Sequence, residues 1–480
     1  MRIALLPVLF LATVLLPIDA SAEDMPTQVW AKNYNVVEDD WGEDVAVDAS
    51  GNVYVTGNVV YSVYHDWLTI KYDADGNLAW TAAFDSGNDT TDAVDTVCGL
   101  DVDDQGNVYV AGYSPGMFHV EWRLIKYDTN GNEIWNAVYT PPSGSTDAGA
   151  HSIDVSGDRI YVTGDVLGTS FDFLTIAYSL DGAIIWQKTH DTGNANENAW
   201  AATADPNGGV YVSGNVWQAT TDWQTIRYDA DGNEVWVATF DSGTNDFQAS
   251  DAIAVDAEDN VYVGGWTENA TTDWQIVKYD SNGAEVWVRT TDEGLNEGVW
   301  GLAVDQQNNL YVHGDVDTGS GWDYRTVKYD PAGVILWDLY SDFGDGLNNG
   351  GRGMVIDDDG FVYLTGHRDN GNNADYWTVK YQQHPPVVDA GPGVDAATGT
   401  DAGQGADAAT GPDAGAGTDA GAGADAATGS DASTGGGSDD ADDTTEEGGC
   451  GCSARGEARH AAIVAGLLGL LLHLRRRRRR

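Results

Sequence analysis

A unit of 50 to 55 residues repeats along most of this chain, and the repeat limits the folds that the chain can adopt. The stretch YDADGNLAW at Tyr72–Trp80 returns with variations at 127–135, 178–186, 228–236, 279–287 and 329–337. Around it, each unit has four short runs that alternate with period two and are rich in Val, Ile, Tyr, Thr and Trp, as β-strands are. Four strands in a period near 50 residues are typical of a β-propeller.

Two markers predict the number of blades. The tyrosine of the VYV run occurs seven times, at Tyr54, Tyr109, Tyr161, Tyr211, Tyr262, Tyr311 and Tyr363. The tryptophan of the fourth strand follows only six of them, but Gln28–Asn35 places Trp30 where the repeat would have the seventh. We therefore expect an all-β, seven-bladed propeller of four-stranded antiparallel blades over 28–384, closed by its N-terminal strand and followed by a disordered stalk.

The repeated turn has a physical explanation. Asp or Asn before Gly favours positive φ and a tight reversal, so DADGN is predicted to join the third strand of a blade to the fourth. The flanking Tyr and Trp are large and flat, and we expect them to fill the outer wedge between neighbouring blades.

The unit D-x-x-GNVYVTG followed by DW-x-T-x-KYD-x-x-GN-x-x-W resembles the SBBP repeat of seven-bladed propellers found in bacterial surface and secreted proteins. The resemblance covers about residues 28–381 and implies the fold without an activity, because that family has no agreed chemistry. The spacing from Gly76 to Trp80 is also similar to the tryptophan-docking motif of quinoprotein propellers, which implies no cofactor here.

The segments before and after the repeats differ from them in composition. Residues 1–22 have a short apolar stretch and an Ala-Ser-Ala end, which predicts a secretory signal cleaved after Ala22; a buried N-terminal helix is the alternative. Residues 385–449 contain a six-residue repeat such as VDAGPG with little apolar bulk, which predicts a disordered linker. A calcium-binding β-roll is the alternative, but its nine-residue period is absent.

Residues 450–480 contain Cys450, Cys452, an apolar stretch over 461–474 and six terminal arginines. The apolar stretch would form about 21 Å of helix, which is short for a stable membrane span. The segment resembles the MYXO-CTERM sorting signal of myxobacterial surface proteins, which implies cleavage near the cysteines and a lipid anchor on Cys450 or Cys452. A permanent single-span anchor is the alternative. We expect an exported protein that is anchored at the outer-membrane surface or is extracellular.

The charge and the cysteine count exclude several classes of function. Without the signal and the residues from Arg455 onward, the chain has 14 basic and 74 acidic residues, and so acidic a surface repels nucleic acid. Cys98 is the lone cysteine of the repeat region, so apolar burial rather than a disulfide framework must hold the fold. A monomeric propeller is expected.

Charges that recur in every unit are expected to build the fold. The first strand of six units ends in aspartate, and the third strand of the same six carries a base: Asp48, Asp103, Asp205, Asp256, Asp305 and Asp357, with Lys71, Lys126, Arg227, Lys278, Lys328 and Lys380. The third unit has Ser156 and Ala177 at these two places, so both partners are lost together and we interpret the two columns as ion pairs. The Asp-Gly turns such as Asp229–Glu234 are interpreted as turns, with Ca²⁺ as a weaker alternative.

One column differs from unit to unit and is the candidate site. Five residues before the end of each first strand stand Glu43, Cys98, His151, Trp200, Asp251, Trp300 and Arg352. We expect Glu43, His151, Trp200, Asp251, Trp300 and Arg352 to line the mouth of the central channel and bind a ligand there. The alternative is that each residue caps its own strand.

No nucleophile elbow, phosphate loop or HExxH motif occurs, so no catalytic residue and no metal site is assigned. We expect a surface-displayed, non-enzymatic module that binds an extracellular glycan, protein or small molecule and is held to the membrane by its C-terminal anchor. The alternatives are a propeller enzyme of lyase, hydrolase or quinoprotein type and a structural envelope protein.

Overall fold

The computed structural model describes residues 25–383, except for 37, 62–63, 88–94, 117–119, 142–147, 194, 218–220, 244–247, 269–270, 292–293, 342 and 344–345. The predicted signal with Ala22, the linker, and the anchor segment with Cys450 and Cys452 lie outside the described residues. Within the described part, no helix is both long enough and apolar enough to cross a membrane.

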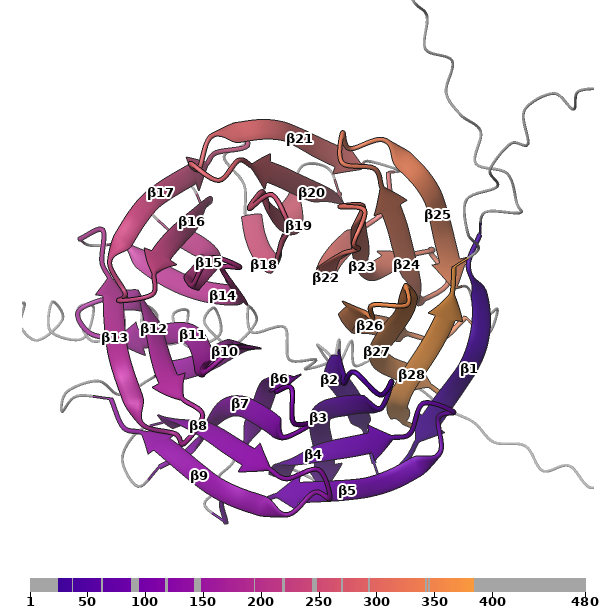
Figure 1. The fold of residues 1–480 in the computed structure, drawn as a ribbon. Helices are drawn as coiled ribbons and strands as arrows, with labels where there is room; N and C mark the ends of the chain where they lie inside the picture. The colour runs from indigo at the N-terminus through magenta and orange to yellow at the C-terminus, as the bar shows by residue number, and fades with distance from the viewer. Residues whose placement is uncertain are drawn as a thin grey trace, which may run out of the picture. The chain divides into compact units, whose positions relative to one another are not determined.

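The described residues form seven antiparallel four-stranded sheets arranged around an axis, which confirms the predicted seven-bladed propeller (Figure 1). In each of the first six blades the chain runs from the innermost strand to the outermost one. The seventh blade also begins with its innermost strand, β26, but its outermost strand comes from the N-terminus of the chain. The strands of blades one to three are β2 (Asp40–Val47), β3 (Val53–Tyr61), β4 (Tyr64–Tyr72), β5 (Leu78–Phe84), β6 (Thr96–Val102), β7 (Val108–Pro115), β8 (Val120–Tyr127), β9 (Glu133–Tyr139), β10 (Ala148–Ser156), β11 (Arg159–Leu167), β12 (Phe171–Ser179) and β13 (Ile184–His190).

The remaining blades follow the same order. Their strands are β14 (Asn196–Ala204), β15 (Gly209–Trp217), β16 (Thr221–Asp229), β17 (Glu234–Phe240), β18 (Gln248–Val255), β19 (Val261–Glu268), β20 (Thr272–Tyr279), β21 (Glu285–Thr291), β22 (Glu297–Val304), β23 (Leu310–Asp317), β24 (Trp322–Tyr329), β25 (Ile335–Ser341), β26 (Asn349–Ile356), β27 (Phe361–Asp369), β28 (Ala374–Gln382) and, completing the seventh blade, β1 (Thr27–Tyr34).

The pairing of β1 with β28 closes the ring as predicted. Trp30 lies opposite Lys380, which is the register of Trp80 opposite Lys71 in the first blade. The N-terminal strand therefore takes the place of a fourth strand that the C-terminal end of the repeats lacks, and it joins the two ends of the array in one sheet.

The fourth-strand tryptophan joins each blade to the next. The Trp80 indole donates a 3.1 Å hydrogen bond to the Thr129 carbonyl in the turn of the second blade. Gly131 of that turn has a φ of 82°, and a Cβ there would lie 2.7 Å from the Trp80 ring. The turn thus needs glycine both for its positive φ and for close contact with the indole. Trp30, Trp186, Trp236 and Trp287 make the same contact with the carbonyls of Ala74, Ala230, Ser281 and Pro331.

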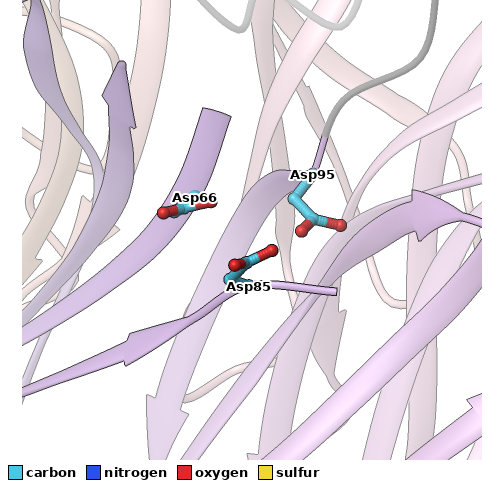
Figure 2. A group of neighbouring side chains, drawn as sticks. All are labelled: Asp66, Asp85 and Asp95. Atoms are coloured by element: carbon cyan, nitrogen blue, oxygen red, sulfur yellow. The ribbon is translucent and has the colours of Figure 1, made fainter. Parts of the chain in front are cut away.

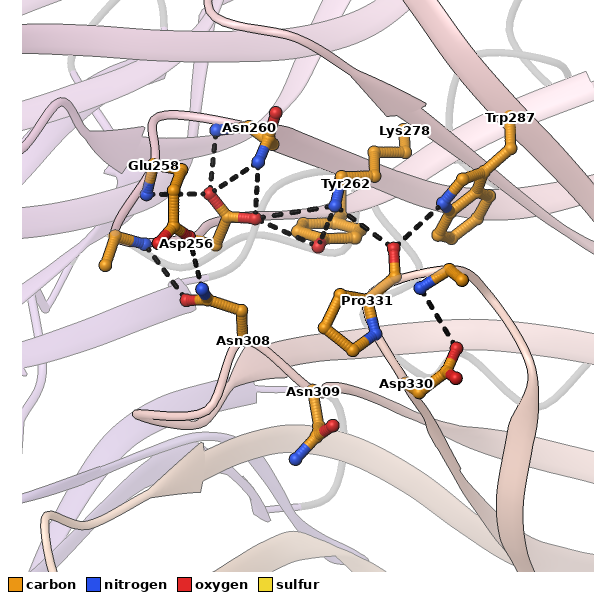
Figure 3. Close-up of polar contacts among 12 residues, drawn as sticks. Asp256, Glu258, Asn260, Tyr262, Lys278, Trp287, Asn308, Asn309, Asp330 and Pro331 are labelled. Atoms are coloured by element: carbon orange, nitrogen blue, oxygen red, sulfur yellow. Dashed lines mark hydrogen bonds and ion pairs between the residues drawn. The ribbon is translucent and has the colours of Figure 1, made fainter.

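The Asp and Lys columns form the predicted ion pairs in four blades, with N–O distances of 2.6 to 3.8 Å. In the fifth blade the Lys278 ammonium lies 3.5 Å from Asp256, and the Tyr262 hydroxyl bridges the two side chains (Figure 3). Lys278 also donates to the Pro331 carbonyl, the same oxygen that accepts from Trp287. One turn carbonyl therefore accepts hydrogen bonds from both the lysine and the tryptophan of the preceding blade.

Two blades replace parts of this contact in ways that the repeat pattern did not reveal. In the third blade, Arg159 of β11 takes over the role of the missing lysine and donates to the Ala230 carbonyl of the fourth blade. The seventh blade has no turn between β28 and β1, so a side chain, Gln383, provides the missing oxygen. Gln383 Oε1 accepts from Lys328 at 2.7 Å and also from the Tyr311 hydroxyl.

Deleting residues 27–34 should open the ring. The deletion exposes the edge of β28 and removes the contact of Trp30 with Ala74, so we expect a lower melting temperature and self-association through the new edge. Trp30→Ala should cost less, about 1–2 kcal/mol, because Trp30 is half-buried. Thermal melts and sedimentation measure both effects, and a deletion variant that stays monomeric with an unchanged melting temperature contradicts the role of β1.

Asp256 and Lys278 should be energetically coupled. We expect Lys278→Ala to destabilise the wild type more than it destabilises an Asp256→Ala background, with a coupling free energy of about 1–2 kcal/mol, because removing one partner leaves the other charge buried. Denaturant unfolding of the wild type, the two single variants and the double variant gives this coupling free energy. The control cycle pairs Asp256 with Lys126 of the second blade and should show no coupling.

Candidate functional site

Each residue of the candidate column lies at a β-bulge in the innermost strand of its blade. The register between first and second strands breaks once per blade, and the break falls at Glu43, Cys98, His151, Trp200, Asp251, Trp300 and Arg352, the last together with Gly353. A bulge interrupts the alternation of side chains between the two packed faces of a sheet and re-aims the extra residue. The seven residues are the third to fifth of their strands, so they lie along the innermost strands rather than at their first residues.

The glycine of the repeated VYVxG run explains why the bulge recurs. A Cβ at Gly214 would lie 2.1 Å from the Asn198 carbonyl oxygen, two residues before the bulge at Trp200. Equivalent contacts of 1.8 to 2.2 Å are found at Gly57, Gly112, Gly164, Gly314 and Gly366. Glycine is therefore needed for the close approach of the two strands beside the bulge.

The structure brings several column residues together around Arg352, and we call this group the Arg352 cluster: Arg352, Trp300, Glu43, Asp251 and Asp315. The Arg352 guanidinium lies over the Trp300 ring at 4.4 Å from its centroid. It is 3.9 Å from a Glu43 carboxylate oxygen and 3.7 Å from one of Asp315. The cluster draws on blades one, five, six and seven.

Burial sets the protonation of the groups in and beside this cluster. It raises the pKa of Asp251 to about 7 and that of Asp315 to about 6, although the positive charge of Arg352 lowers both. Burial, with a smaller contribution from Arg352, lowers the pKa values of His313 and His367 to about 3. Near neutral pH the two imidazoles are therefore uncharged, while the two carboxyl groups can exchange protons.

A second group, the His151 cluster, consists of His151, Trp200, Asp165 and Asn198. His151 Nε2 lies 2.7 Å from Asp165 Oδ1, and Asn198 donates to the other oxygen of Asp165. The rings of His151 and Trp200 are 4.6 Å apart. Nδ1 of His151 and Nε1 of Trp200 are buried and have no hydrogen-bond partner among the described residues. Six of the seven column residues thus belong to two clusters in different blades, and Cys98 belongs to neither.

Three further carboxylates on neighbouring innermost strands were not predicted. Asp44, Asp101 and Asp154 each accept a hydrogen bond from the backbone of the next blade, at Leu100, Val155 and Ala204. Burial raises the pKa of all three, and Asp154 raises that of both Asp44 and Asp101 further. These carboxylates join the inner strands of blades one to four, so they have a structural role.

Another carboxylate group lies where the first blade meets the second. Asp66, Asp85 and Asp95 each offer an oxygen, and these oxygens lie within 4.8 Å of one another (Figure 2). A set of oxygen ligands suits Ca²⁺. It differs from the turn at Asp229–Glu234, where Asp229 Oδ1 accepts from the Asp231 and Asn233 backbone and so stabilises the predicted turn.

Two further residues of the clusters could have been found from the sequence. Asp165 and Asp315 directly follow the glycine of VYVxG, as do Asn58, Tyr113, Asn215, Trp266 and His367. In this second variable column, Asp165 and Asp315 each lie opposite the residue two before the bulge of the neighbouring strand.

No protein-family model and no curated protein matches the chain. Solved structures are similar to it at low sequence identity. A protein of unknown function from Dyadobacter fermentans is 10% identical with a TM-score of 0.46, covering 75% of this chain and 99% of that one. The periplasmic gluconolactonase of Pseudomonas aeruginosa is 14% identical with a TM-score of 0.44, covering 62% and 86%. The polysaccharide lyase Uly1 is 11% identical with a TM-score of 0.46, covering 72% and 90%. Enzymes and a protein of unknown function are thus both represented, and the likeness concerns the fold.

Gly214→Ala should destabilise the propeller by about 2–4 kcal/mol, because the added methyl group overlaps the Asn198 carbonyl oxygen and forces the bulge at Trp200 to move. Gly168→Ala is the control, since a Cβ there meets its nearest atom at 3.5 Å. Chemical unfolding compares the two variants. Equal stabilities would show that the bulge does not require this glycine.

Proposed function

We propose that this protein is a binding module whose ligand contacts the innermost strands at the Arg352 cluster. The observation that carries the proposal is convergence: bulges in blades five, six, seven and one bring Asp251, Trp300, Arg352 and Glu43 to one place, and Asp315 joins them. Residues that build the fold recur in every blade, whereas these differ in each.

The chemistry of the cluster favours a polar ligand with a flat apolar face, such as a saccharide. A guanidinium and carboxylates orient hydroxyl groups by hydrogen bonding, and an indole stacks on the apolar face of a sugar ring. Asp251 Oδ2 is buried without a hydrogen-bond partner among the described residues, so it has an unused acceptor. The His151 cluster adds an imidazole–indole pair, which could contact a longer ligand.

One observation favours catalysis as a second candidate function. The pKa values of Asp251 and Asp315 are about 7 and about 6, the charge of Arg352 lowers both, and Asp315 lies 3.7 Å from its guanidinium. Between these two pH values the pair holds one acid and one base, which is the arrangement that general acid–base catalysis requires. A lyase or hydrolase acting on the bound saccharide would use these two carboxyl groups.

The same proposal places the binding module outside the cell. It rests on the signal-like segment ending at Ala22, on the likeness of the repeat to SBBP proteins and on the likeness of the segment with Cys450 and Cys452 to MYXO-CTERM signals. A lipid anchor and a linker of 65 residues would let the propeller reach ligands in the medium.

An array of neutral and acidic oligosaccharides tests the binding function. For any oligosaccharide that binds the wild type, we expect Trp300→Ala and Asp251→Asn each to weaken binding about tenfold or more, the equivalent of about 1.4 kcal/mol. Val286→Ala on β21 is the control, because Val286 is 53% exposed on an outermost strand. Melting temperatures verify that the variants fold.

The outcome is decisive in either direction. Equal losses in all three variants, or a loss in Val286→Ala alone, would move the site away from the Arg352 cluster. Analysis of the same incubations for cleaved products distinguishes binding from catalysis: turnover with an optimum between about pH 6 and 7 that Asp251→Asn abolishes would establish the enzyme, and intact oligosaccharides support binding alone.

A further inference from the structure

We propose that the Arg352 cluster selects a neutral saccharide over its acidic and amino counterparts, because a hydroxyl group of the ligand bridges the Arg352 guanidinium and the Asp315 carboxylate. A second hydroxyl group of the same ligand bridges Arg352 and Glu43. This inference rests on the proposed function, and it names the class of saccharide that the site accepts.

The guanidinium of Arg352 makes few of the hydrogen bonds available to it. An arginine side chain has five N–H donors, yet the one hydrogen bond that Arg352 makes to a described residue runs from Nη1 to the Gly351 carbonyl at 3.4 Å. Its Nε is buried and has no partner in the described part of the chain. Four other arginines each donate at least one hydrogen bond of 2.6 to 2.8 Å: Arg123, Arg227, Arg289 and Arg325. Arg352 therefore has donors to offer to a ligand.

Two carboxylates face Arg352 from just beyond hydrogen-bond distance. Nη1 lies 3.7 Å from Asp315 Oδ2, and Nε lies 3.9 Å from Glu43 Oε2. Direct hydrogen bonds between a guanidinium and a carboxylate are about 2.7–2.9 Å long. Polar groups at the longer separation are commonly bridged by a small hydroxyl-bearing molecule such as water. An oxygen atom placed beside either pair can lie within hydrogen-bond distance of both members.

Contacts other than these carboxylates hold the cluster in position. The Arg352 guanidinium lies over the Trp300 ring at 4.4 Å from its centroid. Glu43 is oriented through Oε1, which accepts from Trp41 and Asn58, while Oε2 faces Arg352. The arginine and the glutamate are thus oriented before a ligand arrives, which lowers the entropic cost of binding.

The chemistry of the two gaps favours an uncharged ligand group. A sugar hydroxyl group can accept from a guanidinium and donate to a carboxylate at the same time. A ligand carboxylate accepts from Arg352 but cannot donate, so its oxygens would face those of Asp315 and Glu43. A ligand ammonium group donates to the carboxylates but cannot accept, and its charge would lie beside the guanidinium. Both charged groups meet a repulsion that the hydroxyl group avoids.

Matched oligosaccharides test this selection in the full-length protein. Each set has one backbone, of the cellulose, mannan or galactan type, and three forms in which every primary hydroxyl group is kept, oxidised to a carboxylate or replaced by an ammonium group. Because every sugar residue of a charged form is modified, any bound pose brings a charge within electrostatic range of the cluster. Calorimetry at about pH 8 keeps Asp315 ionised, since its pKa is about 6. We expect the wild type to bind the neutral form of at least one set about tenfold or more tightly than either charged form.

Two variants separate the two halves of the bridge. Asp315→Asn should reduce the preference for the neutral form over the carboxylate form about fivefold, because the facing charge is removed. It should fold, because Asn58 and Asn215 occupy the same position in other blades. Arg352→Gln should shift the preference toward the ammonium form. Arg289→Gln is the control and should keep the wild-type ratios, because this arginine donates to turn carbonyls from an outermost strand.

The ratios of affinities decide the outcome, since a general loss of stability weakens the binding of all three forms together. A charged form that binds the wild type as tightly as the neutral form would overturn this inference and leave the proposed binding function in place. Unchanged ratios in Asp315→Asn or in Arg352→Gln would also overturn it. If no form of any set binds, the proposed function itself fails, and the inference fails with it. A neutral preference that both variants change and Arg289→Gln retains supports the bridge.

Discussion

The structure depends on one contact between consecutive blades: the turn carbonyl that accepts hydrogen bonds from the tryptophan and the base of the preceding blade. In the fifth blade Trp287 and Lys278 both donate to Pro331, and Lys278 is held in place by Tyr262 and Asp256. Each blade therefore orients its neighbour, and an error in one contact would prevent closure of the ring. This explains why the chain replaces a missing lysine with Arg159 and a missing turn with Gln383.

Because this outer contact determines how the blades pack, the innermost strands are free to differ. Their edges have a partner on one side only, and the bulge beside the VYVxG glycine turns one residue per blade out of the packed faces. A glutamate, a cysteine, a histidine, two tryptophans, an aspartate and an arginine occupy this single structural position. The propeller thus separates the residues that maintain its fold from those that can recognise a ligand.

Many of the acidic side chains of this chain also have a structural role. Many carboxylates accept hydrogen bonds from the backbone: Asp48 and Asp229 stabilise turns, while Asp44, Asp101 and Asp154 join adjacent inner strands. Others are neutralised by a base, as Glu297 is by Arg325.

The sequence alone determined the fold, the number of blades and the closing strand, because Tyr, Trp, Asp, Lys and the turn glycine recur with nearly the same spacing along the repeats. It also determined the ion pairs, through the joint loss of aspartate and lysine at Ser156 and Ala177, and it located the variable column by position. Only the tertiary structure decided which column residues meet. Arg352 and Glu43 stand at opposite ends of the repeat array and come within 3.9 Å because the ring closes. Gln383, Arg159 and the pairing of His190 with Glu234 were equally hidden, since each occurs once and makes its contact across a blade boundary, where no repetition reveals the partner.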